Sequence, residues 1–77
     1  MDIIKREQID INQNVKVSVA HRNDGLFDCA VYTNFFPTLN PDNWELDESE
    51  VVANEGLTQM AVYGYIENMV KPTYEIG

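Results

Sequence analysis

Basic residues are scarce in this chain. Its 77 residues include five lysines and arginines against thirteen aspartates and glutamates, which gives a formal net charge of −8. DNA, RNA and anionic membranes are held by clusters of lysine and arginine. The composition therefore argues against direct binding of nucleic acid or of a membrane surface.

Cysteine and histidine occur once each, as Cys29 and His21. A single cysteine excludes an internal disulfide, and the two residues together cannot supply a Cys/His zinc site. A catalytic dyad of Cys29 and His21 would need an orienting third group and an oxyanion hole, and the sequence places neither. Segment 42–47 has oxygen ligands for calcium but lacks the glycine and the glutamate of an EF-hand loop, and no phosphate-binding or dinucleotide motif occurs. We therefore expect no catalytic residue, no metal and no cofactor, and a protein that is not an enzyme.

Long apolar runs are also missing. None approaches the ~18 residues of a membrane-spanning helix, and the first seven residues lack the basic and apolar regions of a signal peptide, so we expect a cytoplasmic protein. Proline and glycine fill only seven positions, while hydrophobic residues make up 44% of the chain. This composition favours a folded core, and the length predicts a single domain over residues 1–77.

Two segments of the first half alternate between apolar and polar residues, the pattern of a strand with one buried face. The first runs from Ile9 to Val19 and is interrupted at Asn12-Gln13-Asn14, so that one long strand and two short strands both remain open. The second covers residues 27–35.

Between these segments, Asn23-Asp24-Gly25 predicts a hairpin turn. A two-residue loop would separate the valines of the two strands. A three-residue loop with Gly25 in the left-handed conformation instead places Val17 opposite Val31, and we prefer it because it collects the β-branched residues on one face. The opposite face then carries Lys16, Ser18, Ala20, Asp28, Ala30, Tyr32 and Asn34.

The second half begins with a loop. Residues 38–43 combine proline, asparagine and aspartate, which favour turns and bar sheet pairing. Asp47 or Ser49 can then cap a short acidic helix near 48–54, whose first turn carries glutamates favoured by the helix dipole.

A second helix is expected near 57–71, after a break at Asn54-Glu55-Gly56 and before Pro72. Glu67 and Lys71 form an i,i+4 pair in the favourable order. A helical projection places on one side Ala61, Val62, Tyr65, Ile66, Met69 and Val70.

Together these elements predict an α+β fold with two layers: a small antiparallel sheet, made of a β-hairpin plus an N-terminal strand, packed against one C-terminal helix. Because the core is small, a second copy of the chain or a bound partner would add to its stability.

Negative charge is concentrated in the second half. Residues 1–41 hold five acidic and four basic residues, whereas residues 42–77 hold eight acidic residues and Lys71 as the one basic residue. Segment 42–55 alone carries six carboxylates and no cation. Like charges at this density cost folding stability, so they either keep the protein in solution or serve binding.

The spacing of these carboxylates is compatible with a mimic of nucleic-acid phosphates. A helical segment 42–55 would present one carboxylate per ~3.5 Å, and an extended one about one per 8 Å. One DNA strand presents a phosphate per about 3.4 Å of axis.

Large apolar residues are interleaved with the acidic stretch. Closure of the core by Phe35, Trp44 and Leu46 is one interpretation. The chain has eight aromatic residues, however, which a core of this size cannot bury completely. Exposed rings among carboxylates suit an interface with a basic protein. The predicted partner-binding residues are Asp42, Trp44, Glu45, Asp47, Glu48, Glu50, Glu55 and Tyr63.

The leading hypothesis is a small acidic, non-catalytic binding protein, an inhibitor that docks on a basic, nucleic-acid-binding surface of a partner protein. In general make-up the chain resembles the short acidic proteins that phages encode against host defence, such as anti-CRISPR and anti-restriction proteins, although no motif matches a particular family. The alternative is a structural or assembly module, a homodimer or larger homo-oligomer in which an exposed strand pairs with a copy of itself, with no nucleic-acid mimicry. A small enzyme using His21 and Cys29 is the third hypothesis.

Overall fold

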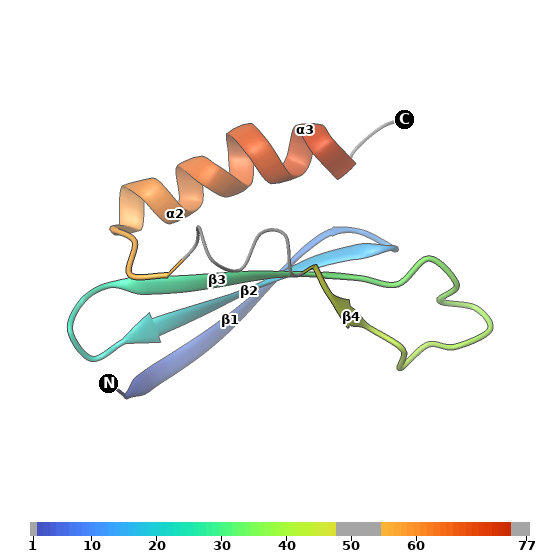
Figure 1. The fold of residues 1–77 in the computed structure, drawn as a ribbon, viewed down its shortest axis with the longest axis horizontal. Coiled ribbons are helices and arrows are strands. Elements are labelled where there is room, and N and C mark those ends of the chain that lie inside the picture. The colour runs from blue at the N-terminus through green and yellow to red at the C-terminus, as the bar shows by residue number, and fades with distance from the viewer. Residues whose placement is uncertain (1, 48–54, 75–77) are drawn as a thin grey trace.

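A four-stranded antiparallel sheet forms one layer and a helix forms the other (Figure 1). The computed structural model describes residues 2–47 and 55–74. The strands lie in the order β1 (Ile3–Asn12), β2 (Val15–Arg22), β3 (Phe27–Thr33) and β4 (Glu45–Leu46). The helix is continuous and comprises α2 (Gln59–Tyr65), the π-helical segment η1 (Ile66–Val70) and α3 (Lys71–Tyr74). This arrangement confirms the predicted α+β fold.

The first alternating segment is two strands joined by a turn. β1 begins at Ile3, earlier than expected, because its first residues carry charges on both faces and conceal the period of two. The turn forms because the backbone N–H of Asn14 donates to Oδ1 of Asn12 at 2.8 Å. Ile9 then lies opposite Val17, so the apolar residues of β1 and β2 share one face.

The β2–β3 hairpin has the expected register. Val17 lies opposite Val31, and the N–H of Arg22 donates to the carbonyl of Leu26 at 2.9 Å, which closes a three-residue loop. Gly25 has a φ of 86°, a left-handed conformation in which a side chain would be strained.

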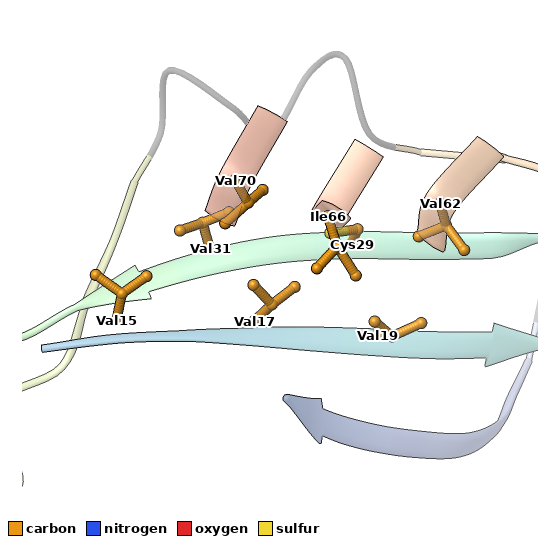
Figure 2. Packing of buried hydrophobic residues seen from close by; sticks show 8 residues of the cluster. All are labelled: Val15, Val17, Val19, Cys29, Val31, Val62, Ile66 and Val70. Carbon is orange, nitrogen blue, oxygen red and sulfur yellow. The ribbon is translucent and has the colours of Figure 1, made fainter. Parts of the chain in front are cut away.

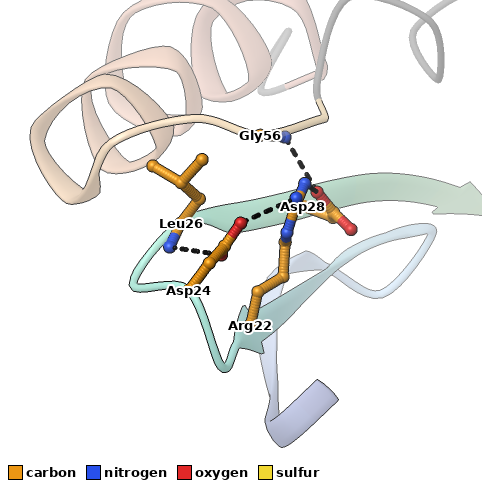
Figure 3. A network of polar contacts seen from close by, with 5 residues as sticks. All are labelled: Arg22, Asp24, Leu26, Asp28 and Gly56. Atoms are coloured by element: carbon orange, nitrogen blue, oxygen red, sulfur yellow. Dashed lines mark hydrogen bonds and ion pairs between the residues drawn. The ribbon is translucent and has the colours of Figure 1, made fainter. Parts of the chain in front are cut away.

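A polar network ties this hairpin to the segment that precedes the helix (Figure 3). Arg22 forms ion pairs with Asp24 at 2.9 Å and with Asp28 at 3.1 Å. The N–H of Leu26 donates to Oδ1 of Asp24. This bond, together with the charge of Arg22, lowers the pKa of the Asp24 carboxyl group. The N–H of Gly56 donates to Asp28 at 2.8 Å. Gly56 has a φ of 67°, and a Cβ there would lie 3.3 Å from Nη1 of Arg22, which confirms the predicted break at this position.

The helix begins at Gln59, two residues later than expected, because Leu57 is paired with the sheet. Leu57 exchanges two backbone hydrogen bonds of 2.8 Å with Phe27 of β3. Thr58 then caps the helix, with its hydroxyl accepting from the N–H of Ala61 at 3.2 Å. No helix of the described residues is both long and apolar enough to cross a bilayer.

The core lies between the helix and one face of β2 and β3 (Figure 2). Burial of each aliphatic side chain contributes about 1.5–3 kcal/mol relative to an exposed one. The residues of the core are Val15, Val17, Val19, Cys29, Val31, Val62, Ile66 and Val70.

The buried face of the helix is narrower than the projection predicted. Val62, Ile66 and Val70 are buried at a spacing of four, which the wide turn of η1 keeps on one side. Ala61 is exposed and Met69 is 59% exposed, so these two residues do not belong to the core.

The prediction that the helix ends before Pro72 is wrong, since α3 continues to Tyr74. The N–H of Lys71 bonds to the carbonyl of Ile66, five residues back. Pro72 follows directly after this π-type bond and continues the helix without donating an N–H of its own. The predicted pair of Glu67 and Lys71 is present at 2.7 Å.

Strand β4 was not expected, because prolines and asparagines dominate the sequence before it. Leu46 pairs with Tyr32 at the edge of the sheet, and the N–H of Asp47 donates to the carbonyl of Val31 at 2.8 Å. The predicted acidic helix near 48–54 lies outside the described residues.

Candidate protein-binding surface

The loop between β3 and β4, residues 34–44, projects beyond the end of the sheet (Figure 1). It presents Phe35 at 66% exposure, Phe36 at 67% and Leu39 at 78%. We call these three residues the apolar tip. Single exposed apolar residues are ordinary, but a group on one loop is typical of an interaction site.

Asn34 organises this loop. It was expected on the open sheet face, but it is only 3% exposed. Its Oδ1 accepts from the N–H of Phe36 at 3.0 Å, and its Nδ2 donates to the carbonyl of Asn40 at 2.7 Å. Asn14 of the β1–β2 turn exchanges two further hydrogen bonds with the backbone of Asn34, at 2.8 and 2.9 Å. The backbone of the loop is therefore held in place by the buried amide of Asn34.

A hollow of about 370 Å³ adjoins the apolar tip. It lies between the loop and the β1–β2 turn, whose Gln13 and Asn14 form one wall, while the three tip residues form much of the other.

Two of the predicted carboxylates, Asp42 and Glu45, follow the apolar tip closely in the chain. Both are exposed, and neither takes part in the ion pairs found within residues 2–47 and 55–74. The N–H of Asn43 donates to the carbonyl of Asn40 at 3.1 Å, which closes a turn between the tip and these carboxylates. Both charges therefore face solvent, and Asp42 lines a hollow together with Leu39 of the apolar tip.

Trp44 lies at the base of the loop on the open face of the sheet, away from the helix. Nζ of Lys16 lies 4.4 Å from the centre of its ring, a cation–π contact. Trp44, Lys16 and Tyr32 are among the residues that line a hollow of about 440 Å³ on this face. Trp44 thus fastens the loop to the sheet.

The interpretation that Phe35, Trp44 and Leu46 close the core is wrong. Phe35 is 66% and Leu46 is 40% exposed, and Trp44 contacts the opposite face of the sheet. The helix already covers the apolar face of β2 and β3, so no room remains there for the loop residues.

The other predicted site residues are dispersed. Asp47 accepts a hydrogen bond from the hydroxyl of Tyr74 at the end of the helix. Tyr63 lies in α2, on the other layer of the molecule, and its hydroxyl donates to Glu7 of β1 at 2.6 Å. Glu55 is exposed and lines a small hollow on the open face of the sheet. The remaining two, Glu48 and Glu50, lie outside the described residues.

Cys29 and His21, the two residues of the catalytic hypothesis, are packed against other side chains of the fold. Cys29 is 4% exposed within the core. His21 packs edge-on against Phe27, with ring centres 4.8 Å apart, and its Nε2 lies 3.8 Å from Oε1 of Glu7. The absence of enzymatic activity stays a prediction.

Sequence reasoning missed Asn34 and Leu39. The signal for them is the apolar run Phe35-Phe36-Pro37-Thr38-Leu39 enclosed by two asparagines, a residue type that bonds to nearby backbone in turns. Comparisons of the chain with protein-family models, with curated proteins and with solved structures give no match.

Proposed function

We propose that this protein is a small acidic, non-catalytic binding protein that docks through its β3–β4 loop on a basic surface of a partner protein. The observation that carries this proposal is the apolar tip, Phe35, Phe36 and Leu39, held exposed by the buried Asn34. Aromatic anchors on a preorganised loop supply most of the affinity in many protein interfaces.

The sign of the charge supports a basic partner. The exposed carboxylate of Asp42 lies beside Leu39 of the tip, that of Glu45 is exposed at the base of the loop, and the chain as a whole carries a net charge of −8. Such a field speeds association with a cationic surface and repels acidic proteins.

The partner surface must be both basic and able to contact apolar side chains. A groove that normally holds nucleic acid has both properties, since it carries lysines and arginines together with apolar or aromatic side chains. Occupation of that groove would exclude the nucleic acid, so we propose that the protein acts as an inhibitor, as the anti-defence proteins of phages do.

The test uses the protein immobilised as bait in an extract of the organism that encodes it. We expect the bait to retain a basic nucleic-acid-binding protein, and we expect added salt and competing duplex DNA to release it. Retention that is indifferent to both would overturn the proposal.

Two variants separate charge from the apolar contacts. Asp42→Asn with Glu45→Gln should slow association with the retained protein and flatten its salt dependence. Phe36→Ser should weaken the affinity at least tenfold, which corresponds to about 1.4 kcal/mol. The control, Asp2→Asn, removes an exposed carboxylate elsewhere and should bind as the wild type does.

A further inference from the structure

One edge of the sheet is open. The strand order places β1 at this edge, where it pairs with β2 alone. Among the described residues no strand covers its other side, whereas the opposite edge of the sheet carries β4 and the bridge of Leu57. An open strand of ten residues is a template for pairing with another chain.

The directions of the backbone groups of β1 follow from the register. The bonds from Arg22 to Leu26 and from Asn34 to Asn14 show that even-numbered residues of β2 bond toward β3. Odd-numbered residues of β2, such as Val17, therefore bond toward β1, because successive residues point to opposite edges. Ile9 is the partner of Val17 and bonds inward. The groups that point to the open edge belong to Arg6, Gln8 and Asp10.

We propose that β1 pairs antiparallel with β1 of a second copy about a two-fold axis at Gln8. In this register Gln8 lies opposite itself, and Arg6 lies opposite Asp10 of the second copy. Because the axis generates every contact twice, the pairing forms two Arg6–Asp10 ion pairs on the open face of the sheet.

Charge favours this register over its neighbours, since an axis at Ile9 would place Gln8 opposite Asp10 and form no ion pair. An axis at Glu7 places two carboxylates opposite each other, and an axis at Arg6 places two guanidinium groups opposite each other, both of which are unfavourable. An axis at Asp10 also places two carboxylates opposite each other. In that register the pairing would extend beyond the regular part of β1, which lies between irregularities at Ile3/Lys5 and Asp10/Asn12. The axis at Gln8 keeps the paired charges within that stretch.

The outward-pointing charges of β1 are not all of one sign, so they do not repel a second copy of the strand in every register. Here the outward positions run from positive Arg6 through neutral Gln8 to negative Asp10. On the helix-facing side, this register places the half-buried Ile9 opposite Glu7 of the second copy.

The first test measures mass in solution by light scattering at physiological salt. We expect twice the monomer mass of 8.8 kDa. Arg6→Asp and Asp10→Arg should each give monomers, since each creates like-charge pairs across the axis. The double variant should restore the dimer. Lys5→Asp makes the same change in net charge as Arg6→Asp at an inward-bonding position and should leave the dimer intact.

The second test identifies the register by disulfide formation in a Cys29→Ala background. Residues that form a hydrogen-bonded antiparallel pair have Cα atoms about 5.5 Å apart, within the range of a disulfide. Gln8→Cys should therefore cross-link to its own copy, and a mixture of Arg6→Cys and Asp10→Cys proteins should form only the mixed dimer. A folded monomer at every concentration, or cross-linking of Asp10→Cys alone, would overturn the proposal. Since no partner protein is present, failure here leaves the docking proposal for the β3–β4 loop unaffected.

Discussion

The hydroxyl of Tyr63 is an example of a single contact that joins the two layers. It donates to Oε1 of Glu7 at 2.6 Å, across 56 positions of sequence. The carboxylate of Glu7 accepts a hydrogen bond that only the neutral phenol can donate, so this bond, with partial burial, raises the pKa of Tyr63 above its ordinary value of 10.0. The residue predicted as a partner contact therefore stabilises the fold.

Tyr63→Phe should lower the free energy of unfolding at neutral pH by about 1 kcal/mol, the net value of a typical hydrogen bond. Because the pKa is raised in the folded state, the stabilisation is complete below pH 10.0 and is lost as the pH rises through the folded-state pKa. Urea unfolding of both proteins at neutral and alkaline pH measures the difference. The control is Tyr32→Phe, because the hydroxyl of Tyr32 has no hydrogen bond within the described residues. If the effect of Tyr63→Phe persisted unchanged at alkaline pH, the hydrogen bond to Glu7 would not be its cause.

At the scale of elements, the strands with a clear alternation of apolar and polar residues were predicted from the sequence, whereas β4 and the end of the helix were not. The period of two and Gly25 were sufficient for the β2–β3 hairpin, because a one-residue slip would expose every valine. β4 depends on pairing with Tyr32 and Thr33, contacts that leave no local pattern. The continuation of the helix past Pro72 depends on a π turn, which has no sequence signature as simple as a cap.

We expect the conformation of the β3–β4 loop to depend on the side-chain hydrogen bonds of Asn34. Asn34→Ala removes two side-chain hydrogen bonds and leaves the N–H of Phe36 and the carbonyl of Asn40 without these partners. We expect a loss of about 1–3 kcal/mol in unfolding free energy and faster hydrogen exchange at the amide of Phe36. Asn34→Asp retains the acceptor for Phe36 and should protect that amide better than alanine does; equal exchange in both variants would show that the side chain does not hold the tip.

At the scale of the whole molecule, charge opposes the compact state. The described residues hold three ion pairs between arginine or lysine and a carboxylate, and two of them share Arg22. Most of the excess negative charge is therefore not neutralised internally and remains available to a cationic partner.

Screening should consequently stabilise the protein. Raising sodium chloride from low to moderate concentration should raise the urea midpoint, with a gain on the order of 1 kcal/mol in unfolding free energy. Asp42→Asn with Glu45→Gln should show a smaller gain, because part of the repulsion is already removed. Parallel mass measurements keep the dimer equilibrium separate, and a midpoint that falls with salt would mean that attractive pairs dominate.

The sequence alone determined the two-layer fold, the hairpin register, the Gly56 break and the Glu67–Lys71 pair, because each depends on residues close in the chain or on a strict periodicity. It also identified Asp42 and Glu45 as exposed carboxylates. Only the tertiary structure decided that Asn34 is buried, that Trp44 contacts Lys16 and that the apolar tip faces solvent. These outcomes depend on which surfaces the helix has already covered, and that is a property of packing between distant segments.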